Sequence, residues 1–130
     1  MLAIAPGTNV PAKWWPTSRF AQTVHALMAR NDVWPVVFGG VNEHPMRHEL
    51  VEKWGCGIMA VRMHSVRHSA ALFEQCVIYL GNDTGVMHLA AATGTPCVAV
   101  FRRVMYQAPG MRWGSVPRCC AHKDRVRVVC

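Results

Sequence analysis

At 130 residues, the chain has the length of one ordinary domain, and its 52% hydrophobic residues are enough to build a buried core. No run approaches the roughly 18 consecutive apolar residues of a membrane-spanning helix, and the first residues lack the basic start and long apolar stretch of a secretory signal. The formal net charge of +7 predicts either a solvated basic face or attraction to anions, such as nucleotide phosphates, a membrane surface or nucleic acid. We expect no nucleic acid, since the usual binding motifs with stacking aromatic residues are missing.

Short apolar runs alternate with segments of helical periodicity along the first hundred residues. In chain order we predict a strand at 2–5, a helix at 18–29, a strand at 34–38, a helix at 45–54, a strand at 58–61, a helix at 65–75, a strand at 77–80, a helix at 84–92 and a strand at 97–101. This alternation is typical of a parallel, doubly wound α/β sheet with helices on both faces. The runs VVF and CVAVF are continuously apolar, as expected for strands covered on both sides.

The pattern weakens after Phe101. Residues 102–124 mix Arg, Pro, Gly and Trp without periodicity, and 125–129 suit either a last strand or part of a tail. We therefore divide the chain into a Rossmann-like α/β domain at 1–101 and an irregular basic C-terminal extension at 102–130.

Cysteine and histidine spacing does not indicate a metal site. The six cysteines show none of the paired spacings of zinc ligands, and reduced thiols in a cytoplasmic protein fit them best. His44 and His48 are four residues apart, as are His64 and His68, but neither pair has the Glu of a metalloprotease motif. We expect solvated histidines, and we predict neither a metal nor a cofactor.

The segment GNDTGVMH joins the fourth predicted strand to the fourth predicted helix. Polar residues at the carboxyl end of a buried parallel strand occupy the usual ligand-binding edge of an open α/β sheet. The free N–H groups and the positive dipole end of a helix start favour a phosphate there. These residues therefore predict a nucleotide or nucleotide-sugar site.

Each residue of this turn suits such a site. Gly81 can take a positive φ, and Gly85 lets a ligand approach the backbone. Asp83 and Thr84 either cap the helix or contact the ligand. His88 lies one turn later on the side of Thr84 and Gly85. A lone helical histidine is more often structural, but here Asp, Thr and Gly accompany it.

Four segments, in the same order, extend this motif into a family resemblance. They are PGTNVPAKWWPTSRFA at 6–21, VVFGGVNEH at 36–44, the predicted helix at 65–75 with AALFEQC, and GNDTGVMHLAAATGTPCVAVF at 81–101. Together they resemble glycosyltransferase family nine, the family of ADP-heptose:lipopolysaccharide heptosyltransferases. The resemblance covers residues 2 to about 101. It implies the C-terminal, donor-binding half of a GT-B type glycosyltransferase.

The resemblance also implies an activity. The expected reaction is metal-independent, inverting transfer of a heptose from ADP-heptose to a growing lipopolysaccharide core, at the cytoplasmic face of the inner membrane. Its general base, an aspartate of the family's acceptor-binding N-terminal domain, has no counterpart in this chain, so no catalytic residue is assigned. We expect the chain alone to bind the donor without transferring sugar, and its basic extension to contact the membrane peripherally. The alternative is a non-catalytic nucleotide-binding module of the same fold.

Carried over position by position, the resemblance implies a set of nucleotide-sugar contacts. They are Thr8, Asn9, Lys13, Glu43, Asp83, Thr84, Gly85 and His88. The first two would contact the phosphates, Lys13 the diphosphate and sugar, Glu43 the nucleoside through its ribose, and the last four the phosphate and heptose. Without the family, Lys13 is a solvated loop lysine and Glu43 an acid at a helix start.

Overall fold

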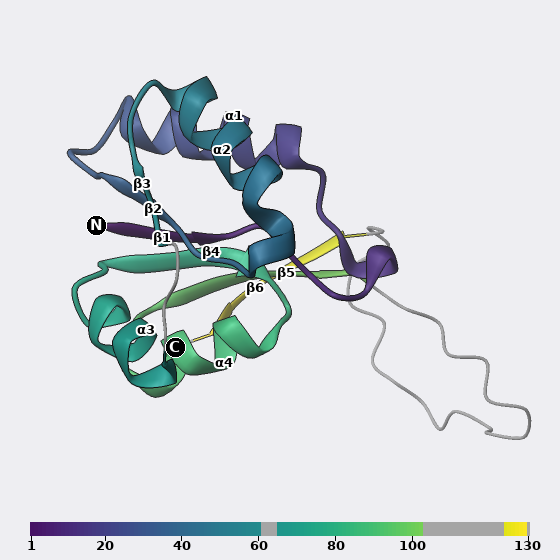
Figure 1. The fold of residues 1–130 in the computed structure, drawn as a ribbon, viewed down its shortest axis with the longest axis vertical. Coiled ribbons are helices and arrows are strands. Elements are labelled where there is room, and N and C mark those ends of the chain that lie inside the picture. The colour runs from purple at the N-terminus through teal and green to yellow at the C-terminus, as the bar shows by residue number, and fades with distance from the viewer. Residues whose placement is uncertain (61–64, 103–123, 130) are drawn as a thin grey trace, which may run out of the picture.

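The computed structural model describes residues 1–60, 65–102 and 124–129, which form one sheet with helices on both faces (Figure 1). The strands are β1 (Leu2–Ala5), β2 (Pro35–Val37), β3 (Ile58–Met59), β4 (Ile78–Asn82), β5 (Cys97–Arg102) and β6 (Asp124–Val129). The helices are α1 (Thr17–Met28), α2 (His44–Trp54), α3 (Val66–Phe73) and α4 (Gly85–Ala92), with short 3-10 turns η1 (Pro11–Lys13) and η2 (Val41–Glu43). Every element predicted up to residue 101 is present, with small shifts at its ends.

The strand order is β3-β2-β1-β4-β5-β6, and β1 to β5 run parallel. The chain adds β2 and β3 on one side of β1, returns through α3, and adds β4 and β5 on the other side. In open α/β sheets, this reversal of direction opens a crevice at the carboxyl ends of the strands. The predicted doubly wound α/β fold is confirmed, and its reversal point lies beside β1.

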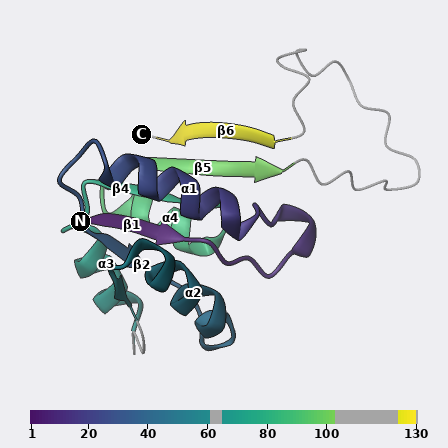
Figure 2. The ribbon, with the colours of Figure 1, turned by 90° about the horizontal axis from the view of Figure 1, so that it is seen from above.

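The strand β6 pairs with β5 in the antiparallel direction, with Phe101 opposite Arg125 and Cys97 opposite Val129. Figure 2 shows the two arrows side by side and pointing in opposite directions at one edge of the sheet. The extension predicted as irregular therefore contains a strand. Its pairing partner is another segment of the sheet, which periodicity within 125–129 cannot reveal. Residues 103–123 lie outside the described part of the chain.

Each face of the sheet has its own apolar core, with α1 and α2 over one face and α3 and α4 over the other (Figure 1). The first core joins four helix residues, Phe20, Val24, Leu50 and Trp54, to residues of β1, β2 and β4. In the second, the Phe38 ring stacks on Phe73 with centroids 4.1 Å apart. None of the helices in the described ranges is long and apolar enough to cross a membrane.

Local signals account for several helix ends. The Ser65 side chain accepts a hydrogen bond of 3.3 Å from the His68 N–H and so caps α3. Helix α2 ends at Trp54 and is followed by Gly55, whose φ of 66° is left-handed and therefore favours glycine. The indole N–H of Trp54 donates to the Ala21 carbonyl at 3.0 Å, which fastens α2 to α1.

Gly81 differs from its predicted conformation. It lies within β4, paired with Ala5 of β1 and Ala99 of β5, and it is not among the glycines of positive φ, which in the described residues are Gly55, Gly57 and Gly94. The prediction of a positive φ was wrong because β4 runs two residues past its predicted end, with Gly81 paired on both sides and Asn82 paired with Val100 of β5.

Candidate functional site

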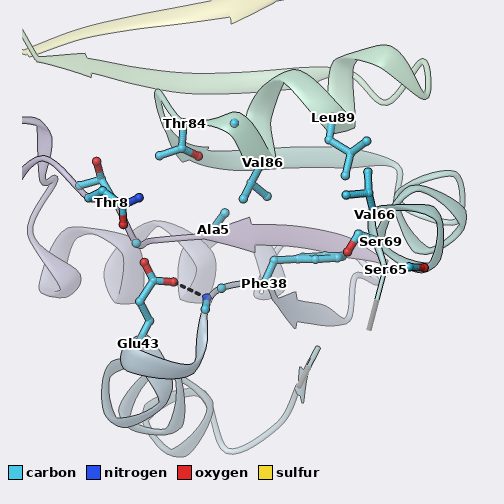
Figure 3. A pocket seen from close by; sticks show the side chains of 15 residues that line it. Ala5, Thr8, Phe38, Glu43, Ser65, Val66, Ser69, Thr84, Val86 and Leu89 are labelled. Atoms are coloured by element: carbon cyan, nitrogen blue, oxygen red, sulfur yellow. Dashed lines mark hydrogen bonds between the residues drawn. The ribbon is translucent and has the colours of Figure 1, made fainter. Parts of the chain in front are cut away.

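A pocket of about 720 Å³ lies at the carboxyl ends of β1 and β2, between the loops that follow them and the helices α3 and α4 (Figure 3). This volume is ordinary for a small-molecule site. The residues that line it are Ala5, Gly7, Thr8, Asn9, Phe38, Gly39, Gly40, Glu43, Ser65, Val66, Ser69, Thr84, Gly85, Val86 and Leu89. The pocket therefore occupies the crevice that the strand order predicts.

The two ends of the pocket differ in chemistry. Figure 3 shows Thr8, Glu43 and Thr84 gathered at one end, and the apolar side chains of Val66 and Leu89 toward the other. A ligand that suits both ends has a polar or charged part and a part with apolar surface.

Glu43 ends the turn η2 and projects toward the loop after β1 (Figure 3). Its Oε2 accepts a 2.8 Å hydrogen bond from the Gly40 N–H. The carboxylate also packs so closely on Gly7 and Gly39 that a Cβ at either position would overlap it. Glycine at these positions is therefore what lets a carboxylate lie between the two loops at the polar end of the pocket.

Arg47 supports the same loop from behind and is buried, with 2% of its surface exposed. Its guanidinium donates to the Gly40 carbonyl at 2.9 Å and to the Ala60 carbonyl at 3.3 Å. Burial lowers the pKa of Arg47, and the nearby Glu43 charge opposes this shift. Sequence patterns did not single out Arg47, because its partners are backbone carbonyls.

At the start of α4, Thr84 is the N-cap residue, but its side chain makes no capping bond. Within the described residues, its buried hydroxyl has no hydrogen-bond partner, and neither has the hydroxyl of Tyr79. Burial raises the pKa of Tyr79, and the neighbouring Thr84 hydroxyl opposes the shift. The Thr84 hydroxyl oxygen is thus enclosed beside Tyr79, and Thr84 lines the pocket through its other atoms.

Asp83 does not cap α4 either. Its Oδ2 accepts a 2.8 Å charge-assisted bond from Lys13 Nζ, and the two side chains are 24% and 31% exposed. The pair lies next to Thr84 without lining the pocket. It joins the loop after β1 to the turn after β4 and keeps the Lys13 ammonium at the residue that precedes Thr84.

The structure therefore brings together most of the predicted site. Thr8, Asn9, Glu43, Thr84 and Gly85 line the pocket, and Lys13 and Asp83 pair beside it. His88 is exposed and does not line it.

The position of His88 follows from helix geometry. Val86 and Leu89 are three residues apart and both face the pocket. Because His88 comes one residue before Leu89, it projects about 100° around the helix from it. Sequence reasoning missed the apolar contributors from α3 and α4, which helical periodicity alone assigns to a core.

Within the part of the chain that the structure describes, no histidine or cysteine lines the pocket. On α2, the rings of His44 and His48 stack 6.2 Å apart, and His48 Nδ1 lies 3.3 Å from a Glu52 oxygen. No group of three potential metal ligands occurs within residues 1–60, 65–102 and 124–129. The buried Cys76 and Cys97 are free thiols whose pKa values are raised by burial. The predictions for His64 and for the cysteines at 119, 120 and 130 lie outside the described residues.

A model of the family described as glycosyltransferase family 9 (heptosyltransferase) matches residues 1–111. The chain belongs to glycosyltransferase family 9. Lipopolysaccharide heptosyltransferase 2 of Salmonella typhimurium is 29% identical over 110 residues, which are 78% of this chain and 30% of that protein. The chain thus spans about 30% of the length of the curated family 9 relatives it matches.

Solved structures of family 9 enzymes agree with this assignment. A glycosyl transferase family 9 protein from Veillonella parvula has a TM-score of 0.68 and 30% identity, over 75% of this chain and 28% of that one. The E. coli ADP-heptose lipopolysaccharide heptosyltransferase II has a TM-score of 0.67 and 27% identity, over 75% of this chain and 31% of that one. The predicted family and the predicted Rossmann-like fold of GT-B heptosyltransferases are confirmed.

Proposed function

We propose that the chain is the donor-binding domain of a heptosyltransferase, which holds ADP-heptose for transfer to a lipopolysaccharide core at the cytoplasmic face of the inner membrane. The observation that carries the proposal is the polar end of the pocket, which is lined by the Glu43 carboxylate and by the start of α4 and lies next to the Lys13–Asp83 ion pair. The names of the relatives, a lipopolysaccharide heptosyltransferase and an ADP-heptose heptosyltransferase, support the choice of nucleotide and sugar.

Under this proposal, each polar group in or beside the pocket contacts a particular part of the donor. Glu43 accepts hydrogen bonds from the ribose hydroxyls, as acidic residues do in other nucleotide-binding α/β folds. The backbone N–H groups at the start of α4 bind phosphate oxygens, and Thr84 and Gly85 border them there. The Lys13 ammonium offsets the charge that develops on the departing diphosphate. His88, outside the pocket lining, stays a predicted contact of the heptose.

Titration calorimetry with ADP, UDP and GDP tests the nucleotide. We expect the 130-residue chain to bind ADP more tightly than the other two. Tighter binding of UDP or GDP would contradict the proposal of ADP-heptose as donor and leave another sugar nucleotide in its place.

A transfer assay tests whether catalysis needs the acceptor-binding domain in addition to this chain. Because the general base of the family belongs to the acceptor-binding domain, the purified chain should transfer no heptose, and mixing it with the acceptor-binding half of a relative should restore some transfer. Robust transfer by the chain alone would contradict this part of the proposal. ADP binding with no transfer in any mixture would favour the non-catalytic module.

The variant Glu43→Gln tests the ribose contact. We expect it to weaken ADP binding about tenfold, since hydrogen bonds to a charged group contribute about 1.5–3 kcal/mol. Calorimetry with 2′,3′-dideoxy-ADP supplies the control, because a ligand without ribose hydroxyls should bind both proteins equally. Glu49→Gln, in an exposed pair with Lys53 on α2, removes the same charge away from the pocket and should leave ADP binding unchanged. An equal loss for both nucleotides in Glu43→Gln would argue against the ribose contact.

A further inference from the structure

The last residue of β4, Asn82, is completely buried, and both ends of its side-chain amide are bonded. Its Nδ2 donates to the Pro6 carbonyl at 2.7 Å, and its Oδ1 accepts from the Trp15 N–H at 3.3 Å. A carbonyl only accepts and a backbone N–H only donates, so the orientation of the amide is fixed by its partners. Only a side chain with a donor and an acceptor at this distance can bond to both Pro6 and Trp15.

Pro6 is the first residue of the loop that joins β1 to α1, and Trp15 lies one residue before the end of that loop. This loop carries Thr8 and Asn9, which line the pocket, and Lys13, which lies beside it. Its other backbone bonds close turns within the loop, such as Lys13 N–H to the Val10 carbonyl at 2.8 Å. The side chains of Asn82 and of the next residue, Asp83, therefore fasten the loop to the carboxyl end of β4.

We propose that Asn82 is a positioning residue for diphosphate binding, which holds both ends of the loop at 6–15 so that Thr8, Asn9 and Lys13 converge on the phosphates. The inference rests on the proposed function, since it gives the loop a ligand. Asn82 itself lies beneath the loop and does not line the pocket. It acts by removing alternative loop conformations before the ligand arrives, which raises affinity without a new contact.

The variant Asn82→Ser tests the proposal without adding charge, because a serine hydroxyl is too short to reach both partners. We expect ADP affinity to fall about tenfold, with a smaller loss for AMP, since AMP lacks the distal phosphate. Asn82→Asp is the second variant. It keeps the size and the acceptor for Trp15 but loses the donor to Pro6, and it should weaken ADP binding at least as much. All affinities are measured by calorimetry at a temperature where circular dichroism shows each protein to be folded.

Thr95→Val is the matched control for a merely structural loss. Thr95 is also a buried polar residue, and its hydroxyl donates to the Phe73 carbonyl at 2.9 Å, but it precedes β5 at the opposite end of the sheet. We expect Thr95→Val to lower the melting temperature. ADP affinity should stay within about twofold of wild type, because Thr95 does not line the pocket.

The outcomes separate this inference from the proposed function. Wild-type protein that does not bind ADP would overturn the proposed function. Wild-type binding of ADP, together with equal binding by folded Asn82→Ser, would overturn only the role of Asn82. If both Asn82 variants unfold, hydrogen exchange in the wild-type chain decides. ADP should slow exchange of the Trp15 N–H, and equal rates with and without ADP would overturn the inference.

Discussion

Replacing Lys13 by alanine should weaken ADP binding roughly 100-fold, a loss of about 2.7 kcal/mol. Two effects add. The variant removes a charge-assisted bond to the diphosphate, and it leaves the Asp83 carboxylate without the cation that lies 2.8 Å from it. An unpaired carboxylate next to the phosphate site repels the ligand. Calorimetry with ADP measures the loss directly.

The double variant Lys13→Ala with Asp83→Asn separates these two effects. Because it removes the repelling carboxylate as well, it should recover part of the lost affinity. Lys53→Ala is the matched control, since Lys53 pairs with Glu49 on the exposed side of α2 at 2.6 Å and its loss changes the net charge equally. ADP affinity in Lys13→Ala within twofold of wild type would refute the role given to this lysine.

Gly81→Ala should destabilise the fold by about 3 kcal/mol, which lowers the melting temperature by roughly 10 °C. A Cβ at this position would overlap the Tyr79 hydroxyl and the Ala5 carbonyl oxygen. The Tyr79 ring is fully buried and the Ala5 carbonyl belongs to the neighbouring strand β1, so neither can move aside cheaply. The strain exceeds the gain of about 0.5–1 kcal/mol that alanine brings over glycine.

Gly85→Ala provides the contrast for this stability measurement. Gly85 is the first residue of α4, and a Cβ there would meet nothing within 4 Å. Thermal unfolding should show a melting temperature equal to or above that of wild type, because alanine favours a helix. Equal melting temperatures for Gly81→Ala and wild type would contradict the packing argument.

The core strands and helices were predictable because their signals are local. Continuous apolar runs mark the buried parallel strands, and helical spacing marks α1 and α3. The pairing of β6 with β5 was not predictable, because the same residues suit a tail equally well until a partner strand is known. The two-residue extension of β4 has the same cause, since it depends on neighbours at Ala5 and Ala99.

Some residues of the candidate site were predictable from the sequence, and others were not. Thr8, Glu43 and Thr84 were predicted from motifs, and the carboxyl ends of parallel strands bring them to one pocket. Asn82 and Arg47 were not predicted, although both are buried and bonded behind the pocket. Their partners are backbone groups contributed by other loops. Because nearly every residue type carries the same backbone groups, the sequence does not indicate where such partners lie.

The central place of β1 in the sheet has a consequence for the order of folding. β1 is early in the chain, yet one of its edges stays unpaired until β4 is available, because β2 covers only the other edge. During synthesis, the nascent chain therefore exposes an apolar strand edge of the kind that chaperones shield from aggregation. The loop at 6–15 also has to wait for Asn82 and Asp83, so the nucleotide pocket is completed only late in folding.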